Sequence, residues 1–353
     1  MRDAAEAPQA AGTSGKGVHR TYVIAEAGVN HDGSLAKALE LVAAARYAGA
    51  DAVKFQTFRA EDLTTGTAGR AEYQKHNMGE DGSQRAMLAG LQLSAADHVT
   101  LRERCDEVGI EFLSSPFDES SVDLLAQMGL KRFKVPSGEL TNLPLLRRVA
   151  HVANAVILST GASWLGEVEA AVRTLADAGV NDLTLLHCVS EYPAPAEQIN
   201  LRAMTTLEHA FGLPVGYSDH TLGSAVPIAA VAMGAVMIEK HITLDRTSPG
   251  PDHAASADPD QFKEMVDGIR AVEAALGDGR KRPMPVEIAN RDLVRKSVTT
   301  VNAMRAGELF TQGSLTLKRP GTGIAPAELP SLIGRRAARD LEADVTLAWT
   351  DVA

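Results

Sequence analysis

Short apolar runs alternate with longer amphipathic stretches along the chain from Tyr22 onward. The apolar runs have the length of β-strands in a packed core. Successive runs are separated by stretches long enough for a helix and two turns. The runs that we predict to be strands are YVIAEA, DAVKFQ, EFLSS, RFKVP, AVILST, LTLLHC, PVGYS and AVMIEKHI.

The stretches between these runs are rich in Ala and Leu and predict helices. SLAKALELVAAARYAG, SAADHVTLRERCDEVG and GEVEAAVRTLADAG each begin at a small or polar residue and end at Gly, as helix caps do. Eight strands and their helices fill residues 22 to about 276, close to the ~250 residues typical of a (β/α)8 barrel. The sequence therefore predicts a TIM barrel. A doubly wound open sheet is the alternative, but no G-x-G-x-x-G motif follows the first strand.

Other parts of the chain do not follow this pattern. The N-terminal segment is rich in Ala, Gly and Ser and has no apolar stretch, which indicates a disordered leader and not a signal peptide. Residues 58–93 make a long loop, which we interpret as a functional lid. The short runs KSVTTV, LTLKRPGTG and DVTLAWTDV near the C-terminus indicate β-structure. We predict a leader over 1–20, a barrel domain over 21–277, a linker over 278–290 and a small β-rich domain over 291–353.

Composition and charge narrow the class of protein. Hydrophobic residues make up 45% and charged residues 23% of the 353 residues, as in ordinary globular proteins. The net charge of −10 argues against a nucleic-acid-binding surface. The most apolar stretch, AVPIAAVAMGAVMI, is shorter than the ~18 residues that a membrane span needs. Cys105 and Cys188 show no thiol motif, so we expect reduced, structural cysteines in a cytoplasmic protein.

Polar residues follow every predicted strand. The carboxyl ends of barrel strands are where catalytic groups lie, and scattered buried polar residues would not collect at the same end of all eight strands. The candidates are Glu26, Lys54, Gln56, Ser115, Lys134, Ser137, Glu139, Ser159, Ser190, Tyr192, Ser218, His220, Glu239 and His241.

Two lysines dominate the candidate chemistry. Lys54 and Lys134, with hydroxyls from neighbouring strands, form a ring of donors suited to a phosphate and a carboxylate together. Lysines that only extend along the rim of the barrel are the alternative. Lys134 could also attack a carbonyl and form a Schiff base, and the residues around it leave both functions open.

Histidines and carboxylates provide the other candidates. His220 and His241 end neighbouring strands, where they hold a divalent cation or are buried and hydrogen-bonded. Glu26 and Glu139 are candidates for a general base, or for ion pairs with the lysines. Asp252, in the turn SPGPDHAAS, accepts sugar hydroxyls or only stabilises the turn.

Eleven motifs occur in order over residues 22–353: IAEAGVNHDGS, AVKFQTF, AEYQKHN, SSPFDE, KVPSGE, ILSTG, LHCVSEYP, GYSDHT, IEKHITLD, GPDHAAS and KRPGTGI. Together they resemble the N-acetylneuraminate (sialic acid) synthase family. The segment GIAPAELPSLIG also resembles the SAF, or type III antifreeze-like, module that ends these enzymes.

This resemblance implies condensation of phosphoenolpyruvate with an open-chain N-acetylmannosamine-type sugar, giving a nine-carbon 2-keto sugar acid and phosphate. Mn2+ or Mg2+ on His220 and His241 would polarise the sugar aldehyde. Glu26 would move protons and Glu139 would lie near the phosphate. The residues implied to cradle phosphoenolpyruvate are Lys54, Gln56, Ser115, Lys134, Ser137, Ser159 and Ser218. Asn77, Tyr192, Asp252 and Arg319 would contact the sugar, with Arg319 coming from the partner in a domain-swapped homodimer.

In this reaction the methylene carbon of phosphoenolpyruvate is the nucleophile, so no imine is needed. We therefore interpret Lys134 as a protonated clamp for the anion. The motifs AEYQKHN and SQRAM are similar to those of members that use N-acetylmannosamine, and equally to those that use a 2,4-diacetamido-trideoxy sugar in legionaminic acid synthesis. A Schiff-base aldolase and a non-catalytic binding module are the remaining alternatives.

Four residues, at three places in the chain, depart from the pattern of the family. Ser190 replaces a common Asn or Thr, and Ala162 replaces a common Met. Ala343 and Asp344 stand where the small domain usually has a Gly turn. The first change would alter phosphate contacts, and the last would loosen the final hairpin.

Overall fold

The computed structural model describes residues 20–78 and 82–353. The predicted leader falls almost wholly outside these residues. The chain divides into two compact units, one ending at Asp278 and the other beginning at Gly279. Each unit has its own hydrophobic core.

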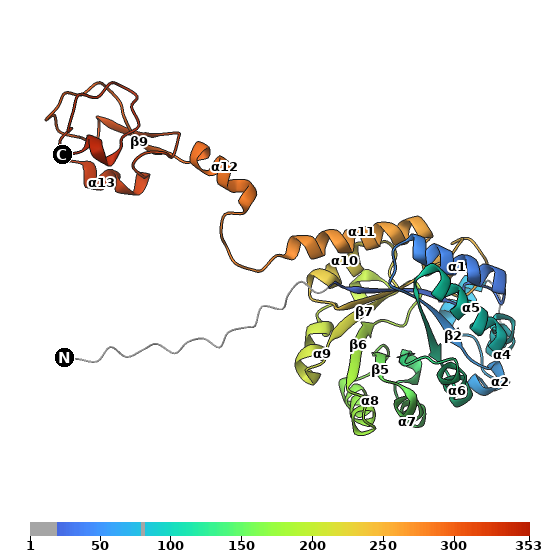
Figure 1. The fold of residues 1–353 in the computed structure, drawn as a ribbon. Coiled ribbons are helices and arrows are strands. Elements are labelled where there is room, and N and C mark those ends of the chain that lie inside the picture. Colours follow the sequence, from blue (N-terminus) through green and yellow to red (C-terminus); the bar gives the residue numbers. More distant parts are fainter. Residues whose placement is uncertain (1–19, 79–81) are drawn as a thin grey trace, which may run out of the picture. The chain divides into compact units, whose positions relative to one another are not determined.

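The first unit is a barrel of parallel strands, in the order β3-β2-β1-β8-β7-β6-β5-β4, and β3 and β4 also contact each other (Figure 1). The predicted TIM barrel is confirmed, and each predicted strand lies within two residues of an observed one. The strands are β1 (Tyr22–Gly28), β2 (Ala52–Thr57), β3 (Glu111–Pro116), β4 (Arg132–Val135), β5 (Ala155–Ser159), β6 (Asp182–Cys188), β7 (Val215–Asp219) and β8 (Met237–His241).

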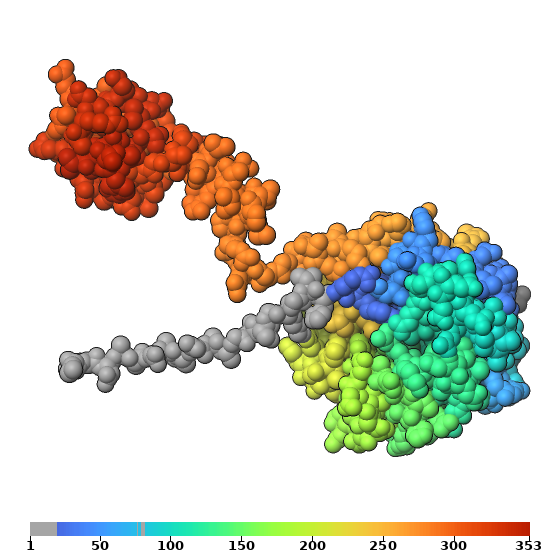
Figure 2. All heavy atoms as spheres, viewed as in Figure 1, coloured from blue at the N-terminus to red at the C-terminus, as the bar shows by residue number. Residues whose placement is uncertain are grey.

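Helices cover the outside of the strands, and the main core lies between the two layers. The helix ends follow from local chemistry: α5 begins with a capping box of Ser94 and Asp97 and ends at Gly109 in the left-handed conformation. Figure 2 shows the blue and blue-green surfaces around α1 and α5 side by side, as the contact between these helices requires. The helices that follow the strands are α1 (Leu35–Tyr47), α5 (Ala95–Val108), α6 (Glu119–Gln127), α7 (Leu143–Val152), α8 (Leu165–Asp177), α9 (Ala203–Phe211), α10 (Ala225–Ala232) and α11 (Pro259–Leu276).

The loop after β2 folds into three short helices. They are α2 (Ala60–Leu63), α3 (Glu72–Met78) and α4 (Gln84–Leu91). α2 and α4 contact each other, and their apolar residues pack in a small cluster that is separate from the barrel core. We call residues 58–93 the lid, the name that the sequence suggested.

The second unit differs in two ways from the sequence prediction. Part of the predicted linker is a helix, α12 (Pro285–Val294), and it begins with Pro285, a residue suited to the first turn. The runs KSVTTV and LTLKRPGTG contribute the antiparallel pair β9 (Ser297–Thr300) and β10 (Leu315–Lys318). DVTLAWTDV forms isolated bridges and a short 3-10 turn, so its β-structure is limited to single bridges. The short helix α13 (Leu329–Leu332) completes the unit.

The missing Gly turn in this unit is replaced by an aspartate. Asp344 adopts a left-handed φ of 66°, which Asp tolerates better than most residues do. Its carboxylate pairs with Lys318 at 2.5 Å. The hairpin therefore has its own local stabilisation without Gly.

No helix in the described parts of the chain combines the length and apolarity that a membrane crossing requires.

Buried neutral histidines predict that acid destabilises the fold. Burial lowers the pKa of His31 from 6.5 to about 4, and burial also lowers that of His98. Between these pH values the unfolded chain binds protons on these histidines that the native state excludes, so their contribution to stability falls as pH falls from 6.5 toward 4. For His31 the full effect is roughly 3 kcal/mol.

Urea unfolding at pH 7.5, 6.5, 5.5 and 4.5 measures this loss directly. His31→Gln is expected to reduce the slope of unfolding free energy against pH by an amount that corresponds to at most one bound proton. The same pH dependence in the native protein and in the His31→Gln variant would contradict the prediction.

Candidate active site

A pocket of about 410 Å³ opens at the carboxyl ends of the barrel strands, a size suited to small-molecule ligands. Its floor follows from the two-residue repeat of the strands. Ile24, Ala52, Leu113, Ile157, Leu186 and Met237 form an apolar layer inside the barrel. The residues two positions further along each strand line the pocket above that layer: Glu26, Lys54, Ser115, Ser159, Cys188 and Glu239.

Most residues predicted from the sequence meet in this pocket. The exceptions are Asn77 and Arg319. Asn77 lies in α3, and its side-chain amide donates to the carbonyls of Tyr192 and Pro251, so it joins the lid to two pocket loops. Arg319 belongs to the second unit. The predicted residues that line the pocket are Glu26, Lys54, Gln56, Ser115, Lys134, Ser137, Glu139, Ser159, Ser190, Tyr192, Ser218, His220, Glu239, His241 and Asp252.

Four buried charges alternate in sign at the floor. Lys54 Nζ lies 2.6 Å from Glu26 Oε2 and 3.7 Å from Glu239 Oε2. Lys134 Nζ lies 3.4 Å from Glu239 Oε1. Ser115 accepts from Lys54, Ser218 donates to Glu239, and Gln56 donates to Glu26.

The two lysines differ in pKa. Burial opposes the charge on Lys54, but Glu239 and Glu26 outweigh it and raise the pKa. For Lys134, burial outweighs the attraction of Glu239, and repulsion from Lys54 adds to the effect, so the pKa is lowered. An anion in the pocket would favour the charged form of both amines.

The pKa values of the two carboxylates, Glu26 and Glu239, also shift in opposite directions. Burial raises the pKa of Glu26 in spite of Lys54, and the negative charge of Glu239 adds to the rise. For Glu239 the attraction of Lys134 and Lys54 overcomes burial and lowers the pKa. Two nearby carboxyls with opposite shifts suit a proton carrier beside a fixed charge, with Glu26 as the carrier.

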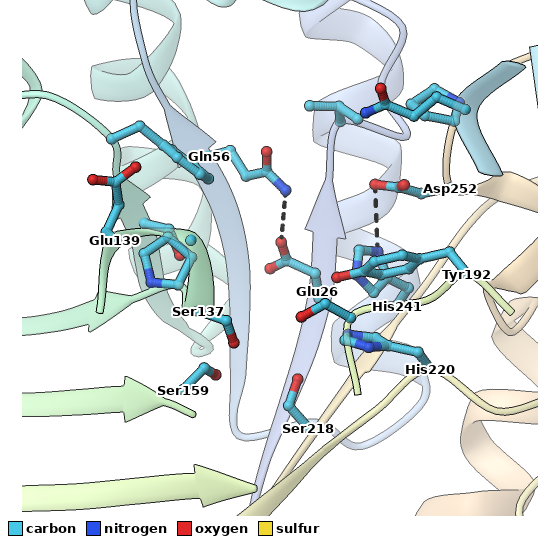
Figure 3. A pocket seen from close by; sticks show the side chains of 18 of the residues that line it. Glu26, Gln56, Ser137, Glu139, Ser159, Tyr192, Ser218, His220, His241 and Asp252 are labelled. Carbon is cyan, nitrogen blue, oxygen red and sulfur yellow. Dashed lines mark hydrogen bonds and ion pairs between the residues drawn. The ribbon is translucent and has the colours of Figure 1, made fainter. Parts of the chain in front are cut away.

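Hydroxyls gather on one side of Glu26. Figure 3 shows Ser137, Ser159 and Glu139 on this side. The amide of Gly161 donates to Ser137 Oγ at 2.9 Å, and Ser159 Oγ has no hydrogen-bond partner within the described part of the chain. A Cβ at Gly161 would lie 2.5 Å from Ser190 Oγ, so only glycine allows this close approach. This side is a cradle of donors for an anion.

Imidazoles gather on the other side of Glu26, together with Tyr192 and Asp252 (Figure 3). The rings of His220 and His241 have centroids 5.5 Å apart, and Tyr192 stacks against His220 at 4.1 Å. Burial lowers the pKa of both histidines, so both are neutral and keep a lone pair.

These imidazoles fit a divalent cation with open positions. His220 Nδ1 bonds to the carbonyl of Val189 at 2.6 Å, which leaves Nε2 free. His241 Nδ1 is buried without a hydrogen bond among the described residues, 3.8 Å from Asp252 Oδ2. Burial, with repulsion from Glu26, raises the pKa of Asp252 to about 7. The described residues contain no group of three or more ligands suited to a metal, so water or substrate would complete the shell.

Cys188 is a free, buried cysteine, as expected, but it also lies at the pocket, which the sequence analysis did not predict. Its thiol lines the pocket and lies 3.1 Å from Ser137 Oγ. Strand alternation could have revealed it, because Cys188 follows Leu186 by two residues on β6 and therefore faces the same interior. Burial raises the pKa of the thiol, which favours the protonated form. His187 and His253 do not line the pocket. His187 forms a hydrogen bond with the carbonyl of Ile199, and His253 forms hydrogen bonds with Thr243 and Asp32.

A second buried ion pair is formed by Asp219 and Lys240, the residues that directly precede His220 and His241. Asp219 and Lys240 are register partners on β7 and β8, and they alternate with the pocket residues of those strands. Lys240 donates to Asp219 and, at 2.6 Å, to the carbonyl of Thr221. Asp219 also accepts from Tyr217 and Thr221. This pair joins the strand ends that carry His220 and His241.

Comparison with known proteins agrees with this architecture. Residues 41–281 match the model of the NeuB family, and residues 295–353 match the SAF domain. The chain belongs to the NeuB family.

Relatives in the NeuB family include the N,N'-diacetyllegionaminic acid synthase of Legionella pneumophila, which is 49% identical over 94% of each chain. The synthase of that name from Campylobacter jejuni is 45% identical over 92% of this chain and 98% of its own. Among solved structures, N-acetylneuraminic acid synthetase from Leptospira borgpetersenii superposes with a TM-score of 0.68 at 33% identity. That match covers 77% of this chain and 90% of the other. The resemblance to sialic acid synthases is thus confirmed, and the chain is an enzyme of the sialic acid synthase type.

Proposed function

We propose that this enzyme condenses phosphoenolpyruvate with 2,4-diacetamido-2,4,6-trideoxymannose to give a diacetylated nine-carbon sugar acid and phosphate. The observation that carries the reaction class is the pocket floor, with two buried lysines between a hydroxyl cradle and two neutral imidazoles. The names of the relatives from Legionella pneumophila and Campylobacter jejuni support the doubly acetylated sugar over N-acetylmannosamine. N-acetylmannosamine remains the second candidate because the matching Leptospira structure is an N-acetylneuraminic acid synthetase.

The reaction divides between the two sides of the pocket. Lys54, Lys134 and the serine cradle hold the phosphate and carboxylate of phosphoenolpyruvate. The methylene carbon of phosphoenolpyruvate bonds to the aldehyde carbon of the sugar, and water adds at C2. The bond from C2 to the phosphate oxygen then breaks, which leaves the keto acid and inorganic phosphate.

Glu26 moves the protons in this scheme. Its raised pKa lets it give a proton to the aldehyde oxygen and take one from the water that adds at C2. His220 and His241 would hold Mn2+ or Mg2+, which supplies Lewis-acid polarisation of the aldehyde. Tyr192 and Asp252 border that position and would orient the sugar.

A second copy of the chain belongs to the proposal. Arg319 would contact the sugar bound in the partner's barrel, in a domain-swapped homodimer. The exposed apolar residues of α12 support an assembly that covers them, since Val286 is 81% exposed and Leu293 is 64% exposed.

Phosphate release tests the reaction. Purified enzyme with Mn2+ and phosphoenolpyruvate is expected to release phosphate with either sugar, and faster with the diacetamido sugar. Release with neither sugar would end the proposal.

Borohydride trapping tests the role of Lys134 in the same sample. The lowered pKa of Lys134 is the direction that an imine-forming amine needs, so a Schiff-base aldolase is the alternative to exclude. We expect no mass increase when borohydride is added with phosphoenolpyruvate or pyruvate. A pyruvyl adduct on Lys134 would establish the aldolase.

A further inference from the structure

One wall of the pocket is apolar, in contrast to the polar floor. It consists of Val29, Leu63, Met87, Leu88 and Leu91, and the lid also contributes the polar residues Thr64, Tyr73, Gln74 and Gln84 to the lining of the pocket. The apolar wall residues belong to the small hydrophobic cluster that includes Phe58 and Phe117. Because the floor already offers donors for a small anion, this wall would meet the parts of the second substrate that extend beyond the floor.

Two of the wall residues, Leu63 and Leu88, have apolar surface that packing within the lid does not cover. Met87 and Leu91 are buried in the cluster, so their packing explains them. Leu63 and Leu88 are only half-buried, and both line the pocket. Their apolar surface is therefore available to a ligand.

The charge of the pocket excludes a second phosphate. Among the described residues that line it, Lys54 and Lys134 are the only lysines, and no arginine lines it. Both amines lie at the floor with Glu26 and Glu239. A sugar phosphate would thus place an anion beside leucines, where none of the described lining residues is a further lysine or arginine, and burying an unpaired anion is costly.

We propose that Leu63 and Leu88 determine the acceptor by contacting its apolar substituents. The site would then take an unphosphorylated amino sugar with a methyl group at C6. A hydroxyl against these leucines would lose its hydrogen bonds to water, whereas a methyl group gains from leaving water. This inference rests on the proposed function and names the residues that set its specificity.

The test compares kcat/KM for three acceptors: the diacetamido-trideoxy sugar, N-acetylmannosamine and N-acetylmannosamine 6-phosphate. The native enzyme is expected to prefer the first over the second by about tenfold or more, and to use the phosphate least. Leu63→Gln and Leu88→Gln are each expected to reduce the preference for the first sugar about tenfold. The KM for phosphoenolpyruvate should stay within about twofold.

Matched variants separate specificity from folding. Ala89 is exposed, lies beside Leu88 on α4 and does not line this pocket, so Ala89→Gln should leave the preference unchanged. Leu88→Met keeps the apolar surface and should retain the preference even where melting temperatures shift. The inference would be overturned, with the proposed function left standing, if the ratio of kcat/KM for the first two sugars were unchanged in both Gln variants. A preference for the phosphorylated sugar would overturn it in the same way. Failure of the native enzyme with every sugar would instead overturn the proposed function.

Discussion

Replacing Lys134 by Met is expected to lower turnover roughly a thousandfold. Met fills a similar volume but removes one of the two cations at the floor, where low polarity makes each charge count most. The KM for phosphoenolpyruvate should rise as well, because Lys134 would hold this anion before and during the reaction. Steady-state phosphate release over a range of phosphoenolpyruvate concentrations measures both effects.

Lys131→Met is the control for the Lys134 variant. Lys131 is exposed and lies just before the same strand, so its loss removes a positive charge from the protein without changing the pocket. The control should keep full activity. If Lys134→Met retained more than a tenth of native turnover, the anion clamp would have to be assigned elsewhere.

Replacing Lys240 by Met is expected to cost about 3–5 kcal/mol of unfolding free energy. The substitution leaves the carboxylate of Asp219 buried without its cation, and Asp219 is fully shielded from solvent. Urea unfolding at pH 7.5 measures the loss. The size of the effect follows from the unpaired charge and not from the lost side-chain volume, since Met is almost as large as Lys.

The double variant Asp219→Asn with Lys240→Met tests that cause. It removes both charges and keeps an amide oxygen for Thr221, so it should recover most of the lost stability. A double variant as unstable as the single one would show that packing, and not charge, is at stake.

The barrel and much of its pocket could be predicted because both depend on one repeat. Strand side chains alternate, so a polar residue two positions after a buried apolar one, such as Glu26 after Ile24, must face the same interior. All eight parallel strands end on the same side, which brings Lys54 and Lys134 together although 80 residues separate them in the sequence. Cys188 obeyed the same rule and was missed because a lone thiol carries no chemical signal of its own.

The lid and the second unit could be predicted less well. Which residues of the lid face the pocket depends on how α2 and α4 pack together, and Leu63 and Leu88 have no local feature that distinguishes them from packing leucines. The helix α12 had a starting signal in Pro285, but the Gly and Pro residues before it indicated a loop more strongly. The final β-type run has the alternation of a strand, yet only single bridges form along it.

The ion pairs at the pocket floor affect how readily the enzyme releases inorganic phosphate in the proposed reaction. Glu26 and Glu239 form ion pairs with the lysines, so an arriving anion replaces existing partners of the amines instead of meeting unpaired charge. The net binding free energy of the anion is the difference between its own attraction to the lysines and that of the carboxylates it replaces, so it stays moderate. In the proposed reaction inorganic phosphate is formed in the same cradle and must escape before the next turnover. The returning carboxylates would help to displace it, so the groups that weaken capture also speed departure.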